Sequence, residues 1–124
     1  MIRSEHMEIR NYTQDGHVVA EIKGKLDSSS VTEAEAKITP LITAKSCMII
    51  DMAKCDYVSS EGLGFLLIVA KKLSTTGGCL TLAGVRDEVK DMLHITNFSS
   101  FFLAYDSVSE ALAAIKEGNN NSKQ

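Results

Sequence analysis

The sequence predicts one α/β domain, with a mostly parallel sheet and flanking helices. Strand-like runs alternate with helical stripes along the chain, in the order β-β-α-β-α-β-α-β-α. The run "CMIIDM" at 47–52 is apolar without alternation, as in a central strand covered on both faces. The first two strand-like runs are joined by Asp15-Gly16, which is typical of a hairpin turn. A length of 124 residues suits a single domain of this kind.

The first third of the chain predicts a hairpin followed by a helix. Residues 7–9 and 18–23 alternate apolar and polar side chains, as half-exposed strands do. Ser30 and Glu33 have the spacing of a capping box, so a helix is expected to follow Ser30. Apolar residues recur at helical spacing up to residue 42, and Pro40 is expected to kink this helix or end its regular part.

The central strand and the helix after it form the middle of the chain. The strand is expected to end at Asp51, and a loop is expected over 53–58. The helix that follows should cover the sheet with one set of apolar residues, and a second set should point away from the centre of that face. A neighbouring helix or a partner could cover the second set. The first set is Leu63, Leu66, Leu67, Ala70 and Leu73; the second is Phe65, Ile68 and Val69.

Two more strand–helix units complete the predicted domain. The strands are "CLTLAG" at 79–84 and "FFLAY" at 101–105, and a helix over 85–93 lies between them. Ser107 and Glu110 form a second capping-box pattern before the last helix. The domain is therefore expected over 7–117. Residues 1–6 are interpreted as an expression tag or a disordered N-terminus, and 118–124 as a disordered polar tail.

Composition excludes several classes of function. The net charge is −3 and no basic patch is visible, so neither nucleic acid nor an anionic membrane is an expected partner. The longest apolar run, 65–70, is too short to cross a bilayer, and no signal peptide is recognisable. We therefore expect a soluble cytoplasmic protein.

Neither the cysteines nor the histidines suggest a metal, a cofactor or catalysis. Three cysteines without CxxC spacing argue against a disulfide framework or a zinc site. Cys47 and Cys79 are expected to be buried thiols in strands, and Cys55 to lie in a loop. The three histidines are scattered along the chain, and no P-loop, G-x-S-x-G or G-x-G-x-x-G motif is present. No enzyme activity is predicted.

The start of the helix after 53–58 has an unusual composition. Either Ser59 or Ser60 is suited to be its N-cap, and Glu61 in the first turn suits the helix dipole. Gly62 and Gly64 each cost roughly 1 kcal/mol relative to alanine in a helix, so they need a reason. Glycines allow other groups to approach the backbone, and a helix N-terminus favours a phosphate. That phosphate could belong to a ligand or to a modified serine.

Three segments together resemble a STAS domain of the anti-sigma-factor-antagonist type. "GKLDSSS" at 24–30 resembles the G-x-L-D segment of that family, and "MIIDMAKCDYVSSEGLGFLL" at 48–67 its strand, loop and phosphosite helix. "EVKDMLHITNFSSFFLAYDSVSEAL" at 88–112 resembles the remaining elements. The resemblance covers nearly all of 7–117.

This resemblance implies a phosphorylation-controlled switch. In the family, a partner kinase that is also an anti-sigma factor phosphorylates a serine at the start of the second helix. The unmodified antagonist binds this kinase, phosphorylation releases it, and a PP2C-type phosphatase restores binding. Register against the motif glycine points to Ser60 as the phosphosite, with Ser59 as the alternative. The residues implied to contact the partner are Asp27, Ser59, Ser60, Glu61, Gly62, Gly64 and Phe65.

The chain departs from the family pattern on both sides of Ser60. Ser59 stands where the family often has Asp, and Glu61 where it often has Ser or Ala. Glu61 places a negative charge beside the acceptor and bears on which kinase is used. Asp27 and Asp51 match acidic positions that flank the family site, although turn and cap chemistry would explain both equally well.

Two other classes of protein were weighed against this switch. A response-regulator receiver also ends a central strand with Asp, but it needs an acidic pair after its first strand and a lysine after its last. The β-β start and "YDSVSE" after the last strand do not fit that pattern. The second is a STAS module of a transporter or signalling complex that is never phosphorylated and only docks. Such modules often lack the acceptor serine, so Ser60 favours the switch.

Overall fold

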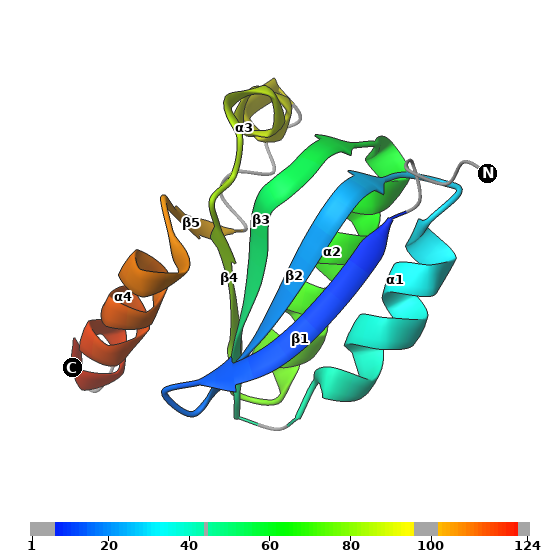
Figure 1. Cartoon of the computed structure of the whole chain (residues 1–124). Coiled ribbons are helices and arrows are strands. Elements are labelled where there is room, and N and C mark those ends of the chain that lie inside the picture. Colours follow the sequence, from blue (N-terminus) through cyan, green and yellow to red (C-terminus); the bar gives the residue numbers. More distant parts are fainter. Residues whose placement is uncertain (1–6, 44, 96–101, 122–124) are drawn as a thin grey trace.

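The fold is a five-stranded mixed sheet with helices on both of its faces (Figure 1). The computed structural model describes residues 7–43, 45–95 and 102–121. The strands are hydrogen-bonded in the order β1-β2-β3-β4-β5, with β1 antiparallel to β2 and all other neighbours parallel. The strands are β1 (Glu8–Gln14), β2 (His17–Leu26), β3 (Cys47–Val58), β4 (Cys79–Ala83) and β5 (Leu103–Tyr105). The α-helices are α1 (Val31–Ile38), α2 (Ser60–Thr75), α3 (Asp87–Ile95) and α4 (Val108–Asn121).

The predicted α/β class and the order of elements are confirmed. Asp15 and Gly16 form the turn between β1 and β2, both with positive φ (53° and 82°), as a two-residue hairpin requires. The interpretation of residues 1–6 lies outside the described residues. At the other end, α4 continues to Asn121, past residue 117 where the domain was expected to stop.

The predicted end of the central strand is wrong. β3 does not stop at Asp51 but runs twelve residues to Val58, so the expected loop at 53–58 is strand. The reason is that β2 is also long and pairs with β3 as far as Leu26 opposite Val58. Two register shifts interrupt this pairing, between Glu21 and Lys23 and between Gly24 and Lys25. Such irregularities break the period-2 pattern by which a strand is recognised in a sequence.

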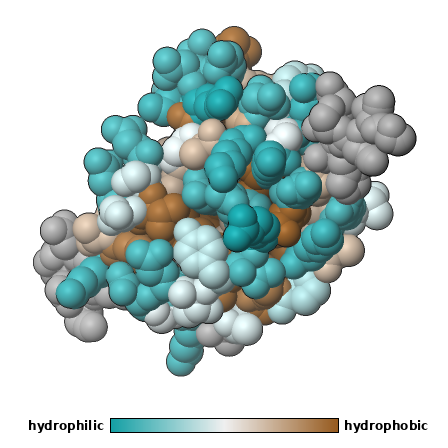
Figure 2. All heavy atoms as spheres, in the orientation of Figure 1, coloured by the Kyte–Doolittle hydropathy of each residue, from teal (hydrophilic) through white to brown (hydrophobic). Residues whose placement is uncertain are grey.

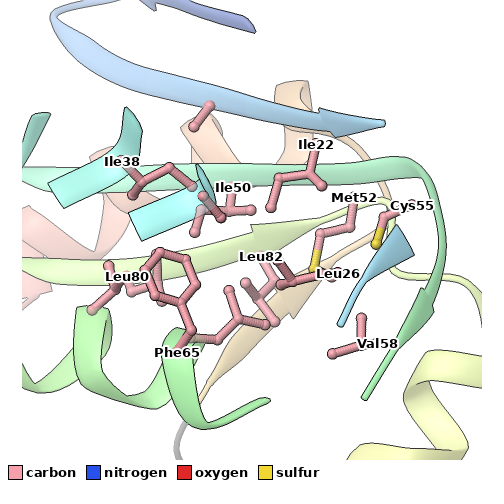
Figure 3. Packing of buried hydrophobic residues seen from close by; sticks show 14 of the residues in the cluster. Ile22, Leu26, Ile38, Ile50, Met52, Cys55, Val58, Phe65, Leu80 and Leu82 are labelled. Carbon is pink, nitrogen blue, oxygen red and sulfur yellow. The ribbon is translucent and has the colours of Figure 1, made fainter. Parts of the chain in front are cut away.

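The larger hydrophobic core lies between the sheet and the helices α1, α2 and α3. Figure 3 shows part of it, with the ring of Phe65 extending from α2 toward the strands that carry Ile50 and Leu80. A smaller cluster on the other face joins Val19 and Ile49 to the apolar side of α4. α4 leaves the β1 side of this face uncovered (Figure 1), and the surface seen there mixes hydrophilic residues with smaller apolar patches (Figure 2).

The ends of the helices follow the sequence signals in part. α1 ends at Ile38 and passes into a 3₁₀ turn that contains Pro40, as expected of a proline at this point. Ser30 is the N-cap of α1, but the capping box is not formed. Its hydroxyl instead donates to the Lys25 carbonyl at 2.7 Å and accepts from the Asp27 amide at 3.0 Å.

Cys47 and Cys79 lie in strands as predicted, but the prediction that they are buried thiols is wrong, and so is the loop position of Cys55. Cys47 and Cys79 face each other in register at the starts of β3 and β4, with a Cα–Cα distance of 4.4 Å, and form a disulfide. Both are half-buried. Cys55 lies in β3 and not in a loop, its side chain is fully buried, and this burial raises the pKa of its thiol.

Candidate functional site

The turn from β3 into α2 is organised by Ser59. This residue is the N-cap of α2, with extended backbone (φ −87°, ψ 178°), and only 9% of it is exposed. Its Oγ accepts a hydrogen bond from the Gly62 amide at 3.2 Å and donates to Glu61 Oε1 at 3.1 Å. Its own amide donates to the Leu26 carbonyl at 2.9 Å, which ties the helix start to the end of β2. Ser59 is therefore the structural member of the serine pair.

Ser60 is the first residue of α2 and is exposed. Within the described part of the chain, no group forms a hydrogen bond with its hydroxyl, whereas the hydroxyl of Ser59 is both donor and acceptor. The two adjacent serines thus differ in their chemical availability. Only Ser60 presents a free hydroxyl at a helix N-terminus, where unpaired backbone N–H groups and the helix dipole favour negative charge.

Gly62 has an internal structural role, and its predicted contact with a partner stays a prediction. A Cβ at this position would lie 2.5 Å from the Leu26 carbonyl oxygen and 3.0 Å from Val58 Cγ1. Glycine is therefore required for α2 to begin against the ends of β2 and β3.

Gly64, one half-turn further along α2, has a different environment. Apart from its chain neighbours and the adjacent backbone of α2, no heavy atom of the described residues lies within 4 Å of the place where its Cβ would be. The fold does not demand glycine here, so the missing side chain leaves an open space on the surface of the helix. This is the arrangement expected if Gly64 serves an external contact.

The buried face of α2 differs from the face that the sequence predicts. Phe65 and Val69, which were expected to point away from the centre of the sheet-facing side, are 5% and 1% exposed and belong to the core. Leu67 and Ala70, which were expected to face the sheet, are only half-buried. Gly62 on this helix packs against Leu26 and Val58, and a period of 3.6 residues in the sequence does not reveal such a contact. Ile68 remains exposed.

Of the two predicted flanking aspartates, only Asp27 lies beside the site. It directly follows Leu26, whose carbonyl accepts a hydrogen bond from the Ser59 amide. Its carboxylate accepts hydrogen bonds from the hydroxyl and the amide of Ser29 at 2.8 and 3.0 Å, and the bond from this hydroxyl is the main reason why its pKa is lowered. Asp51 lies seven residues before the end of β3, about 23 Å for an extended strand, and therefore does not flank Ser60.

Sequence reasoning missed two residues near the site. The carbonyl of Leu26 receives the Ser59 amide, but no sequence signal marks it, because the contact exists only once β2 and β3 pair. Tyr57 is 47% exposed and lies three residues before Ser60. In a loop, as the sequence analysis assumed, an exposed tyrosine is not notable. In a strand, its alternation with the buried Val58 marks it as a residue that faces outward.

Metal and membrane features are absent from the described residues. Over 7–43, 45–95 and 102–121, no three His, Cys, Asp or Glu side chains are grouped closely enough to hold a metal ion. In the same ranges, none of the helices has the length and apolar character needed to span a bilayer.

Comparison with known proteins identifies the class to which this fold and site belong. The chain belongs to the STAS domain family, whose model matches residues 8–111. It is 31% identical over 103 residues to BtrV of Bordetella bronchiseptica, which is named as an anti-sigma factor antagonist, and the match covers 82% of this chain and 89% of BtrV. The predicted resemblance is confirmed.

Solved structures show the same fold at low sequence identity. An anti-sigma factor antagonist from Mycobacterium paratuberculosis gives a TM-score of 0.82 at 20% identity, over 94% of this chain and 99% of that one. The phosphorylated form of the Bacillus cell fate determinant SpoIIAA gives 0.67 at 18%, over 87% and 99%. A sulfate transporter family protein from Wolinella succinogenes gives 0.71 at 21%, over 85% and 88%. The fold is therefore shared by antagonists and by transporter-associated modules.

Proposed function

We propose that this chain is a partner-switching antagonist that is controlled by phosphorylation of Ser60. Its unmodified form binds a serine kinase that is also an anti-sigma factor, phosphorylation releases that kinase, and a PP2C-type phosphatase reverses the modification. It acts in the cytoplasm as a binding protein without catalytic activity of its own. The observation that supports this most is the exposed, unbonded hydroxyl of Ser60 at the start of α2, next to a serine that is fully engaged.

The electrostatics of the turn suggest how the switch works. A phosphate adds about −1.5 to −2 charges, and the N-terminus of α2 tolerates these charges, so the fold itself should persist. The new charge would add to those of Glu61, the next residue in the chain, and of Asp27, which follows the end of β2. In a complex, this surface must approach the phosphates of the kinase-bound nucleotide, so phosphorylation would repel the partner.

The residues expected to contact the partner fall into two groups. Asp27, Ser60, Glu61 and Gly64 are exposed or half-buried, and we propose them as direct contacts. The others, Ser59, Gly62 and Phe65, are buried and would act by shaping the start of α2 from below.

Phosphate transfer tests this function directly. The purified chain is incubated with ATP and, in turn, with each ATPase-type serine kinase encoded in the genome that carries this gene. We expect one kinase to label Ser60 alone, so Ser60→Ala should remain unlabelled and Ser59→Ala should still be labelled. Label on Ser59 and not on Ser60 would contradict the assignment.

The likeness to the Wolinella transporter protein favours a second candidate, a STAS docking module that is never phosphorylated. In that case none of the kinases would label the chain. Substitutions at Ser60 would then leave binding to a transporter or a signalling complex unchanged.

A further inference from the structure

The Cys47–Cys79 disulfide lies at the starts of β3 and β4, the opposite end of these strands from the Ser60 site. Both cysteines are half-buried, whereas the third cysteine, Cys55, is fully buried. Cellular thiols keep most cysteines of cytoplasmic proteins reduced, and the disulfides that form there are usually transient and act in catalysis or redox sensing. A permanent structural link is therefore not the expected role of a half-buried pair in this compartment.

Cys79 lies at an open part of the sheet. Among the described residues, β4 pairs with β5 only from Thr81 onward, opposite Leu103, so this pairing starts two residues after Cys79. A cavity of about 230 Å³ adjoins this part of the edge, and Cys79, Ser74 of α2 and Leu103 are among the residues that line it. The side of Cys79 that faces away from β3 is therefore accessible to another molecule.

Cys47 is enclosed on the corresponding side. β3 lies between β2 and β4, and β2 pairs with it from Val18 opposite Met48. Cys47 also packs against the apolar cluster beneath α4. A thiolate attacks a disulfide sulfur from the side opposite the sulfur that leaves, and access decides which sulfur reacts. For Cys47 that side is the β2 side, and for Cys79 it is the open edge of β4, so the geometry favours attack on Cys79.

From these features we infer that Cys47 and Cys79 form a reversible thiol–disulfide modification site, reduced by a dithiol protein of the thioredoxin class and re-oxidised by hydrogen peroxide. Only the cytoplasmic location is taken from the proposed function. In the reduction, a thiolate of the dithiol protein attacks the Cys79 sulfur, and Cys47 leaves and takes up a proton. The second thiol of the dithiol protein then attacks the mixed disulfide and releases Cys79. Two electrons pass to this chain, and the dithiol becomes a disulfide.

The oxidation returns the same two electrons. The Cys79 thiolate attacks one oxygen of hydrogen peroxide and breaks the O–O bond, which gives a sulfenic acid and one water. The Cys47 thiol then attacks the sulfenic sulfur, the S–S bond forms, and the hydroxyl group leaves as a second water. Cys55 is fully buried and takes part in neither direction.

The disulfide closes the segment that carries the phosphosite. Cys47 and Cys79 are 32 positions apart, and the segment between them contains β3, the turn at Ser60 and all of α2. In the chain-entropy model, the bond restricts the unfolded form of this segment and so stabilises the folded one. The redox state of the pair therefore controls how readily α2 opens from the sheet.

Enzymatic reduction of the folded chain tests this site. The oxidised chain is incubated without denaturant with thioredoxin, thioredoxin reductase and NADPH, and is then alkylated. We expect NADPH to be consumed in equal amount to the chain, with label at Cys47 and Cys79 and none at Cys55. Cys55→Ala is the matched control and should behave as the parent chain, whereas a double change of Cys47 and Cys79 to Ser should consume no NADPH. Reduction only after unfolding would show a permanent link and overturn the inference.

Re-oxidation tests the other half of the cycle. Hydrogen peroxide added to the reduced chain should restore the Cys47–Cys79 disulfide, as seen by mass spectrometry of the peptides. Sulfinic acid on Cys79 in place of the disulfide would overturn the reversible cycle. Thioredoxin that lacks its second active-site cysteine should be trapped on Cys79, and capture on Cys47 would overturn the assignment of the attacked sulfur.

Hydrogen exchange tests the link to the phosphosite segment. The amides of α2 should exchange about tenfold faster or more in the reduced chain than in the oxidised one, and equal rates would overturn this link. None of these measurements uses a kinase. If no kinase labels Ser60 but thioredoxin reduces the folded chain, the proposed switch fails and the redox site stands. If Ser60 is labelled and the folded chain resists thioredoxin, the switch stands and the redox site is overturned.

Discussion

Alanine at Gly62 and alanine at Gly64 should change stability in opposite directions. Both replacements gain roughly the same helix propensity, about 1 kcal/mol, so the difference between them reports the local packing. At Gly64 the new methyl group enters open space, and the gain should be realised. At Gly62 it would lie 2.5 Å from the Leu26 carbonyl oxygen, a backbone atom that cannot rotate away.

The size of the effect follows from this clash. Overpacking of this kind costs typically about 1–3 kcal/mol, and displacing the Leu26 carbonyl also strains its bond to the Ser59 amide. We therefore expect Gly62→Ala to be less stable than Gly64→Ala by about 1–3 kcal/mol. For a domain of this size, each kcal/mol shifts Tm by roughly 3–5 °C.

The free energies of unfolding of both variants and of the parent chain are measured by urea and thermal unfolding, followed by circular dichroism. Gly64→Leu completes the set: it should fold normally but bind the kinase more weakly, because its side chain fills the open space at a proposed partner contact. A Gly62→Ala variant as stable as Gly64→Ala would refute the packing account of the start of α2.

Three further predictions concern Ser59, the cysteines and Asp27. Ser59→Ala should cost about 1 kcal/mol through the lost N-cap, measured by urea unfolding, and a change below the error of the melt would contradict its capping role. The Cys47–Cys79 disulfide spans 32 residues, so its reduction should lower the free energy of unfolding by about 3–4 kcal/mol in the chain-entropy model. When the unreduced chain is unfolded and alkylated, mass spectrometry should find Cys55 as the single labelled thiol. Two further labelled thiols would contradict the pairing. Because the folded-state pKa of Asp27 is lowered, its contribution to stability is present above the unfolded pKa of about 3.9 and is lost as pH falls through the folded value. The stability gap between the parent chain and Asp27→Asn should therefore shrink in unfolding curves taken from about pH 5 down to pH 3, and a gap that widens would contradict this sign.

Much of the fold follows from local sequence signals. The Asp15-Gly16 turn, the apolar run that forms the first part of β3 and the 3₁₀ turn at Pro40 each depend on a few neighbouring residues. The second half of β3 does not, because residues 53–58 become strand only when the bulged end of β2 pairs with them. Local sequence patterns do not predict such pairing.

The disulfide left a signal that counting cysteines overlooks. Cys47 and Cys79 each open the apolar run of a predicted parallel strand, so in-register pairing of these strands brings the two residues together. The rotation of α2 left no such signal. Phe65 is buried and Ile68 exposed, and the packing of Gly62 against Leu26, a residue far away in the sequence, is a contact that no local pattern predicts. For the candidate site, the sequence identified Ser60 but could not separate its role from that of Ser59 without the hydrogen bonds of the cap.

The most direct test of the switch is the affinity of Ser60→Ala and Ser60→Asp for the kinase that labels the parent chain. Each variant is titrated against that kinase with ADP bound, and Ser59→Ala serves as the control for disturbance of the helix start. Ser60→Ala keeps the neutral surface and cannot be modified, so it should bind as tightly as the unmodified chain. Ser60→Asp adds about one charge beside Glu61 and should bind about tenfold more weakly or worse, a loss of about 1.4 kcal/mol. Equal affinity of the two variants would contradict a switch that works by charge at Ser60.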